Sequence, residues 1–297
     1  MITGFAIILD DKVLYCSNES SYTSFEIILF VEKLISSINP KRTWLLHSLF
    51  LKGYRMGRER ILIKHIYTPE EQNLFYCVGG DFQANSPAAE EMLEDFEKKV
   101  KEYYANIDLL KDASEKPIFN EIIEIATDYL WDKYEDRIEE EEQFQIESDS
   151  DISNNILYCG ISTQGLPIIS HLYSRILLDN LGKEITEENV DLLSSSLSAK
   201  LATIAMNTVI RAKTSIKEIH ICDREESNAK KYIFFGKIGH FTLDFFASGD
   251  YCQIQKVFNK LRETLLKEEI LQEEFSGDLK PYRYLHDFIT RFYEKGL

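Results

Sequence analysis

Two segments of the chain open in the same way. Residues 4–17, GFAIILDDKVLYCS, and residues 156–173, ILYCGISTQGLPIISHLY, each predict a strand, a polar turn and a second strand. The first turn is expected at Asp10-Asp11. The second is expected between Thr163 and Pro167, where Gly165 allows a positive φ. Each hairpin is followed by a segment with helical periodicity, so the same β-β-α beginning occurs twice.

The rest of the N-terminal half is predicted to contain three helices and three strands. Ser20 and Ser21 are candidate caps of the first helix, and Ser86-Pro87 predicts the start of another, because serine caps a helix and proline suits its first position. The predicted elements are a helix over 21–38, strands over 43–54, 60–67 and 73–80, a helix from 86 to about 107, and a helix over 120–138.

The C-terminal half predicts the same order of elements. Thr186 is the expected cap of a long helix whose Leu193, Leu197 and Leu201 share one face. The predicted elements are strands over 155–162 and 166–173, a helix over 186–210, strands over 215–222, 230–238 and 240–247, and helices over 250–271 and 281–295. Both halves therefore read β-β-α-β-β-β-α-α.

An acidic stretch separates the halves. Residues 139–151, EEEEQFQIESDSD, hold seven acidic residues and no basic one. Repulsion between like charges and a shortage of apolar side chains disfavour a packed core there. We therefore predict an N-terminal domain over 1–138, an acidic linker over 139–153 and a C-terminal domain over 154–297, with docking of a basic partner as an alternative use of the linker.

This element order resembles longin domains, in which one helix follows the second strand of a five-stranded antiparallel sheet and two helices follow the fifth. GFAIILDDKVLYCS, the helix over 21–38, the three strands and SPAAEEMLEDFEKKVKEYY carry the resemblance in the N-terminal half. ILYCGISTQGLPIISHLY, SAKLATIAMNTVI and KYIFFGKIGHFTLDFF make the C-terminal half similar also to the roadblock fold. The resemblance implies an α+β protein with two longin/roadblock-like (profilin-like) domains.

The same resemblance implies a function. Longin and roadblock domains are non-enzymatic modules that pair with each other and serve vesicle trafficking and small-GTPase control. It implies a scaffold that binds a small GTPase, another longin/roadblock-type subunit, or a second copy of itself by dimerisation. Because fold alone does not determine function, a structural subunit of a coat or tether and an enzyme with a dispersed site stay open as alternatives.

Composition narrows the class of protein further. The formal net charge is −16, whereas a nucleic-acid-binding surface is usually basic, so we expect no nucleic-acid partner. The N-terminus lacks the pattern of a signal peptide, and the apolar runs are shorter than a membrane span. The cysteines form no CxxC pair and are interpreted as small buried side chains of a cytoplasmic protein. They are Cys16, Cys77, Cys159, Cys222 and Cys252.

The motifs of common catalytic sites are missing. The sequence contains no GxxxxGK[ST], GxGxxG, HExxH or GxSxG, and Gly79-Gly80 is interpreted as the end of a strand. We therefore expect no catalytic residues, no cofactor and no metal site.

One basic stretch stands out in this acidic chain. LKGYRMGRERILIK, residues 51–64, spans a predicted β-turn and has Glu59 as its only acidic residue. Such a patch can attract an acidic partner or anionic lipid head groups, although a solvated hairpin or pairing with the acidic linker is the alternative. The candidate partner-binding residues are Lys52, Arg55, Arg58, Arg60 and Lys64.

Overall fold

The structure is a computed structural model that describes residues 1–17, 22–53, 57–68, 70–141, 154–174, 187–225 and 229–296. The chain is mixed α+β, and the strand pairs within each half are antiparallel. The predicted caps Ser20, Ser21 and Thr186 lie outside the described residues, as does Arg55.

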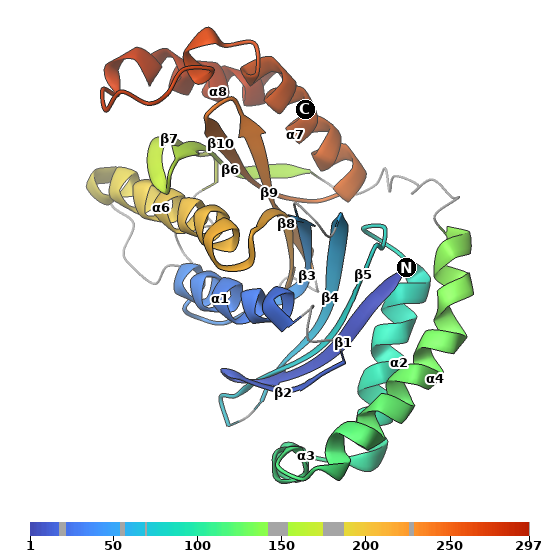
Figure 1. The fold of residues 1–297 in the computed structure, drawn as a ribbon. Helices are drawn as coiled ribbons and strands as arrows, with labels where there is room; N and C mark the ends of the chain where they lie inside the picture. Colours follow the sequence, from blue (N-terminus) through green and yellow to red (C-terminus); the bar gives the residue numbers. More distant parts are fainter. Residues whose placement is uncertain are drawn as a thin grey trace. The chain divides into compact units, whose positions relative to one another are not determined.

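The N-terminal half follows the predicted order with one additional helix (Figure 1). Ser86 caps α2 by accepting a hydrogen bond from the Ala89 amide, and Pro87 is the first helical residue, as predicted. The elements are β1 (Ile2–Leu9), β2 (Lys12–Cys16), α1 (Tyr22–Ile38), β3 (Trp44–Gly53), β4 (Arg58–Tyr67), β5 (Asn73–Gly80), α2 (Pro87–Tyr103), α3 (Ile107–Ser114) and α4 (Ile118–Glu141).

The C-terminal half follows the same plan. Gln164 and Gly165 turn the first hairpin with φ values of 47° and 81°, so the expected positive φ at Gly165 is confirmed. The elements are β6 (Asn155–Thr163), β7 (Leu166–Leu172), α6 (Glu187–Ala212), β8 (Thr214–Asp223), β9 (Ala229–Ile238), β10 (Phe241–Ser248), α7 (Tyr251–Leu265), two 3₁₀ turns (Glu269–Leu271 and Lys280–Tyr282) and α8 (Arg283–Gly296).

The strands of both halves are connected in the same way. Their order is β2-β1-β5-β4-β3 in the N-terminal half and β7-β6-β10-β9-β8 in the C-terminal half. Counted from the first strand of each half, both orders are 2-1-5-4-3. In each half the first strand therefore lies between the second and the fifth, and the helix after the hairpin leads to the strand at the opposite end of that order.

Helices cover both faces of the N-terminal strands. The first turns of α1 lie on one face, where Ser24 Oγ donates to Glu59 Oε2 at 3.0 Å. The other face packs against α2, α3 and α4 (Figure 1). Buried side chains at that contact include Phe5, Tyr76, Phe96, Phe119 and Leu130.

In the C-terminal half, α6 packs on β6, β7, β8 and β10, whereas α7 packs on β9 and β10, and α8 on β7. Leu193, Leu197 and Leu201 of α6 are buried, so the predicted apolar face is confirmed.

The chain divides into two compact units, Met1–Phe30 with Leu45–Ile146 and Val31–Trp44 with Glu147–Leu297. The helix predicted over 120–138 runs from Ile118 to Glu141, so its last three residues belong to the predicted linker. Residues 142–153 lie outside the described residues, so the domain boundary there stays a prediction.

Two predicted helix ends differ from the structure. The helix from Ser86 ends at Tyr103, and Asn106 caps the unpredicted α3 by accepting a hydrogen bond from the Leu109 amide at 2.9 Å. The helix predicted over 250–271 ends at Leu265, and a 3₁₀ turn at Glu269–Leu271 follows. In both places local hydrogen bonds to a short polar or backbone group replace continued helix.

Candidate interaction surfaces

The basic hairpin presents fewer exposed charges than its sequence suggests. Lys52 of β3 and Arg58 of β4 are exposed and are cross-strand neighbours in the antiparallel register. Between them, residues 54–56 lie outside the described residues. The two basic side chains therefore lie side by side at the end of the hairpin.

The next two basic residues of the stretch face the protein. Arg60 is only 3% exposed; its guanidinium lies 4.8 Å from the centre of the Phe50 ring and donates to Ser48 Oγ at 3.4 Å. Lys64 is half-buried, and its Nζ lies 3.9 Å from Glu97 Oε2 of α2. Arg60 is therefore held against side chains of β3 and Lys64 reaches α2, so neither residue extends the patch.

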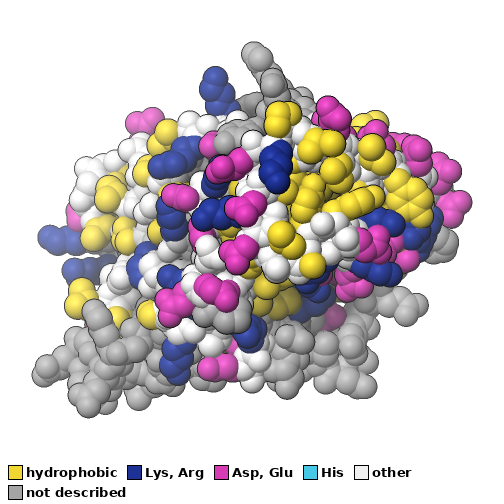
Figure 2. Space-filling model, turned by 90° about the horizontal axis from the view of Figure 1, so that it is seen from below, with side chains coloured by type: hydrophobic (Ala, Val, Ile, Leu, Met, Phe, Trp, Pro, Cys, Tyr) yellow, Lys and Arg dark blue, Asp and Glu magenta, His cyan; other side chains and the backbone are white. Residues whose placement is uncertain are grey.

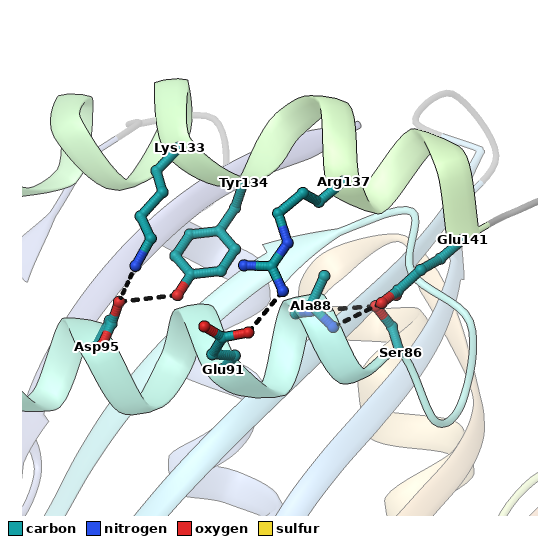
Figure 3. Close-up of polar contacts among 9 residues, drawn as sticks. Ser86, Ala88, Glu91, Asp95, Lys133, Tyr134, Arg137 and Glu141 are labelled. Atoms are coloured by element: carbon teal, nitrogen blue, oxygen red, sulfur yellow. Dashed lines mark hydrogen bonds and ion pairs between the residues drawn. The ribbon is translucent and has the colours of Figure 1, made fainter.

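A ladder of polar contacts joins α2 to α4 (Figure 3). Arg137 donates to Glu91 at 2.6 Å, and one turn further along α2 Lys133 donates to Asp95, also at 2.6 Å. Tyr134 is buried between these pairs and donates to Asp95 at 2.8 Å. Hydrogen bonds from Arg137 and from Lys133 lower the pKa of the Glu91 and Asp95 carboxyls, respectively.

The end of α4 caps the beginning of α2. Glu141 Oε1 accepts from the Ala88 amide at 2.8 Å, and its other oxygen hydrogen-bonds to Ser86 Oγ (Figure 3). A carboxylate at this position satisfies amide groups that have no partner within the helix and complements the positive end of its dipole. The two helices are therefore fixed in one antiparallel register.

The same register leads into an apolar surface. Four residues beyond Asp95, Lys99 Nζ lies 5.6 Å from the centre of the Tyr129 ring, a cation–π distance. One further step of four places Tyr103 of α2 opposite Ile125 of α4. Tyr103 is 53% exposed and Ile125 is 68% exposed. At this end of the helix pair, exposed apolar side chains therefore take the place of the ion pairs.

We call the outward side chains Ile118, Ile122, Ile125 and Tyr129 of α4, together with Tyr103, the α4 apolar face. On α4 they recur at spacings of four, three and four, which makes one stripe along the helix. Ile118 and Tyr129 are 57% and 55% exposed, and Ile122 is partly exposed. Figure 2 shows hydrophobic side chains gathered on the side of the molecule where α3 and the start of α4 lie in Figure 1.

Sequence reasoning missed this surface because α4 carries two apolar stripes. Ile122 and Tyr129 belong to the outward stripe, whereas Ile123, Ala126 and Leu130 are buried against the N-terminal core. The signal that distinguishes the two stripes is the 4-3-4 spacing from Ile118 to Tyr129.

Cavities lined by described residues lie elsewhere. One, of about 370 Å³, lies between the β4–β5 end and the start of α3, and its lining includes Ile66, Leu74 and Tyr104. The other, of about 410 Å³, lies between β7 and α8, and its lining includes Ile169, Tyr282 and His286. At its edge His171 Nδ1 is 3.4 Å from His286 Nε2, and burial together with His286 lowers the pKa of His171.

The C-terminal half also contains a buried acid–base group, formed by Glu218 and His220. His220 Nε2 lies 3.0 Å from Glu218 Oε2, and Tyr251 OH donates to the same carboxylate at 3.2 Å. Neither described cavity is lined by these residues. Within the described ranges, no group of three or more His, Cys, Asp or Glu side chains is arranged to hold a metal ion.

Among the described helices, none is both long and apolar enough to cross a membrane. The sequence matches no protein-family model and no curated protein.

Proposed function

We propose that the chain is a tandem longin/roadblock-like scaffold that binds a small GTPase or another longin/roadblock-type subunit. The observation that carries the proposal is the 2-1-5-4-3 strand order found in both halves, each with one helix after the hairpin and further helices after the fifth strand. Each half then corresponds to one five-stranded domain of this class, and the chain acts without catalytic chemistry of its own.

The exposed surfaces support a binding role. Lys52 and Arg58 place two adjacent positive charges at a hairpin end, and the α4 apolar face leaves large hydrophobic side chains uncovered. Patches of this kind usually mark contacts with other macromolecules. In this proposal, the positive charges of Lys52 and Arg58 bind an acidic surface of the GTPase.

Nucleotide release tests the proposal directly. The full chain is added to small GTPases from the same genome, each preloaded with fluorescent GDP, and complex formation is followed by size-exclusion chromatography. We expect a stable complex with at least one GTPase and a changed rate of GDP release. A Lys52→Glu/Arg58→Glu variant should weaken that complex, whereas Lys267→Glu, a charge reversal at another exposed lysine, should leave it intact.

The outcomes separate this proposal from its competitors. Binding that does not depend on the nucleotide, with no change in GDP release, assigns the chain to a structural subunit of a larger complex. Failure to bind any of the GTPases or any longin/roadblock-type protein from that genome overturns the proposal.

A further inference from the structure

We infer that the α4 apolar face is a docking surface for a basic amphipathic helix of a partner protein. The inference rests on the surface itself and stands whether or not the partner proposed above is a GTPase. Its first support is geometric: Ile118, Ile122, Ile125 and Tyr129 occupy the spacing at which one helix packs along another.

The second support is the exposure of these side chains. Four of the five members of the face, Tyr103, Ile118, Ile125 and Tyr129, are more than half exposed. Burying a large apolar side chain is worth about 1.5–3 kcal/mol. Two isoleucines and two tyrosines uncovered on adjacent helices therefore represent binding free energy that the described part of the chain does not use.

The third support is charge, and it selects the partner. Glu121, Glu124, Asp128 and Asp132 follow α4 at spacings of three and four, and all four side chains are exposed. This acidic row lies along the α4 apolar face on the side away from α2, because Lys133 and Arg137 on the other side reach toward α2 (Figure 3). A helix with an apolar stripe bordered by lysine or arginine complements both features.

The register between α2 and α4 makes the surface rigid. The pairs Glu91–Arg137 and Asp95–Lys133, with the Glu141 cap on α2, fix the two helices against each other. Tyr103 and Ile125 are therefore held in place before any partner binds, which reduces the entropy lost on association.

The acidic row argues against other occupants. An anionic membrane surface would be repelled by four carboxylates beside the face, and a second copy of the same face would bring two acidic rows together. The partner we commit to carries the opposite charge.

A peptide pair tests the inference. A fluorescent 18-residue helix with a leucine stripe and lysine flanks is titrated with the full chain, and the same peptide with glutamate flanks is the control. Fluorescence anisotropy should show at least about tenfold tighter binding of the lysine peptide, and the difference should shrink as salt rises because exposed charges are screened.

Matched variants locate the binding. Ile125→Ser should weaken binding of the lysine peptide at least about fivefold, whereas Leu192→Ser on α6, which removes a side chain of similar exposure (69%), should not. Glu124→Lys/Asp128→Lys should move the preference toward the glutamate peptide. Because all these side chains are exposed, the melting temperature of each variant should stay within a few degrees of the wild-type value.

Three results would overturn the inference. One is equal binding of the two peptides, and another is an equal effect of Leu192→Ser and Ile125→Ser. The third is evidence that the α4 apolar face has a different occupant. Such evidence would be binding of the chain to phosphatidylserine vesicles, or dimerisation detected by sedimentation, if Ile125→Ser abolishes it. None of these results bears on GTPase binding at the hairpin, so the two proposals fail separately.

Discussion

Trp44 Nε1 lies 2.9 Å from Asp223 Oδ2, and the same carboxylate oxygen accepts a hydrogen bond from Lys231 Nζ at 2.8 Å. Asp223 and Lys231 are 4% and 3% exposed. Trp44 is the last residue of the segment Val31–Trp44. This segment belongs to the same compact unit as the C-terminal half, although the two are far apart in sequence. A buried, hydrogen-bonded ion pair thus holds the end of that segment.

Removal of one partner of this ion pair should be costly. Lys231→Met leaves the Asp223 carboxylate buried without its counter-charge, and we expect a loss of about 3–5 kcal/mol in the free energy of unfolding. The double variant Asp223→Leu/Lys231→Met should lose much less, because no buried charge is left uncompensated. Urea unfolding at pH 7 measures both variants; strictly additive losses would show that the two side chains act independently.

The buried face of α6 gives a second stability prediction. Leu197 is 2% exposed, and Leu197→Ala should lower the free energy of unfolding by about 2–5 kcal/mol, as truncation of core leucines does. Leu192 on the same helix is 69% exposed, so Leu192→Ala should change it by less than about 0.5 kcal/mol. Similar effects of the two substitutions would mean that the helix does not pack through Leu197.

Structural features that depend on short stretches of sequence could be predicted. The cap at Ser86, the strand over Asn73–Gly80 and the Leu193/Leu197/Leu201 face follow from patterns within a few residues, and the structure contains all three. The helix α3 was missed because it is eight residues long and buries only Leu110, so it carries almost no periodic signal.

Other features depend on residues that are distant in sequence. Arg60 was expected at the surface, but its burial is decided by Ser48 and Phe50 on the neighbouring strand. The contact of Trp44 with Asp223 joins residues 179 positions apart, and neither has a local pattern that points to the other. The exposed stripe of α4 could have been found from its spacing, whereas its position beside the acidic row and α2 required the helix register.

Asp244 predicts a pH dependence in the C-terminal half. This carboxyl is fully buried, Ser162 Oγ donates to it at 3.0 Å, and burial raises its pKa to about 8. In the unfolded chain an aspartate titrates near pH 3.9, so between about pH 4 and 8 the folded state holds a proton that the unfolded state releases. Stability should therefore fall as pH rises through this window, with a slope on the order of 1 kcal/mol per pH unit.

Asp244→Asn isolates that contribution. Asparagine keeps the size of the side chain but cannot ionise, so the variant should gain stability relative to the wild type as pH is raised from 5 to 8. The comparison is made by urea unfolding at each pH. Parallel pH profiles for the two proteins would show that Asp244 is ionised in the folded state at the lower pH values as well.

Arg58 and Arg60 should respond in opposite ways to charge reversal. Arg58 is exposed on the hairpin, so Arg58→Glu should change the free energy of unfolding by less than about 0.5 kcal/mol. Arg60 lies over Phe50 and is 3% exposed, so Arg60→Glu buries a carboxylate and should cost more than about 3 kcal/mol. Arg60→Met keeps part of the packing without a charge and should cost less than Arg60→Glu.

Charge reversal at the hairpin also tests whether it is a binding site. The double variant Lys52→Glu/Arg58→Glu should slow association with an acidic partner. This effect should weaken at higher salt, because exposed charges are screened over about 10 Å at 0.1 M. Stopped-flow measurements at two salt concentrations separate the association rate from the dissociation rate. If Arg60→Met, which leaves the exposed charges unchanged, slows association as much as the reversals do, the hairpin acts through its conformation and not through its charge.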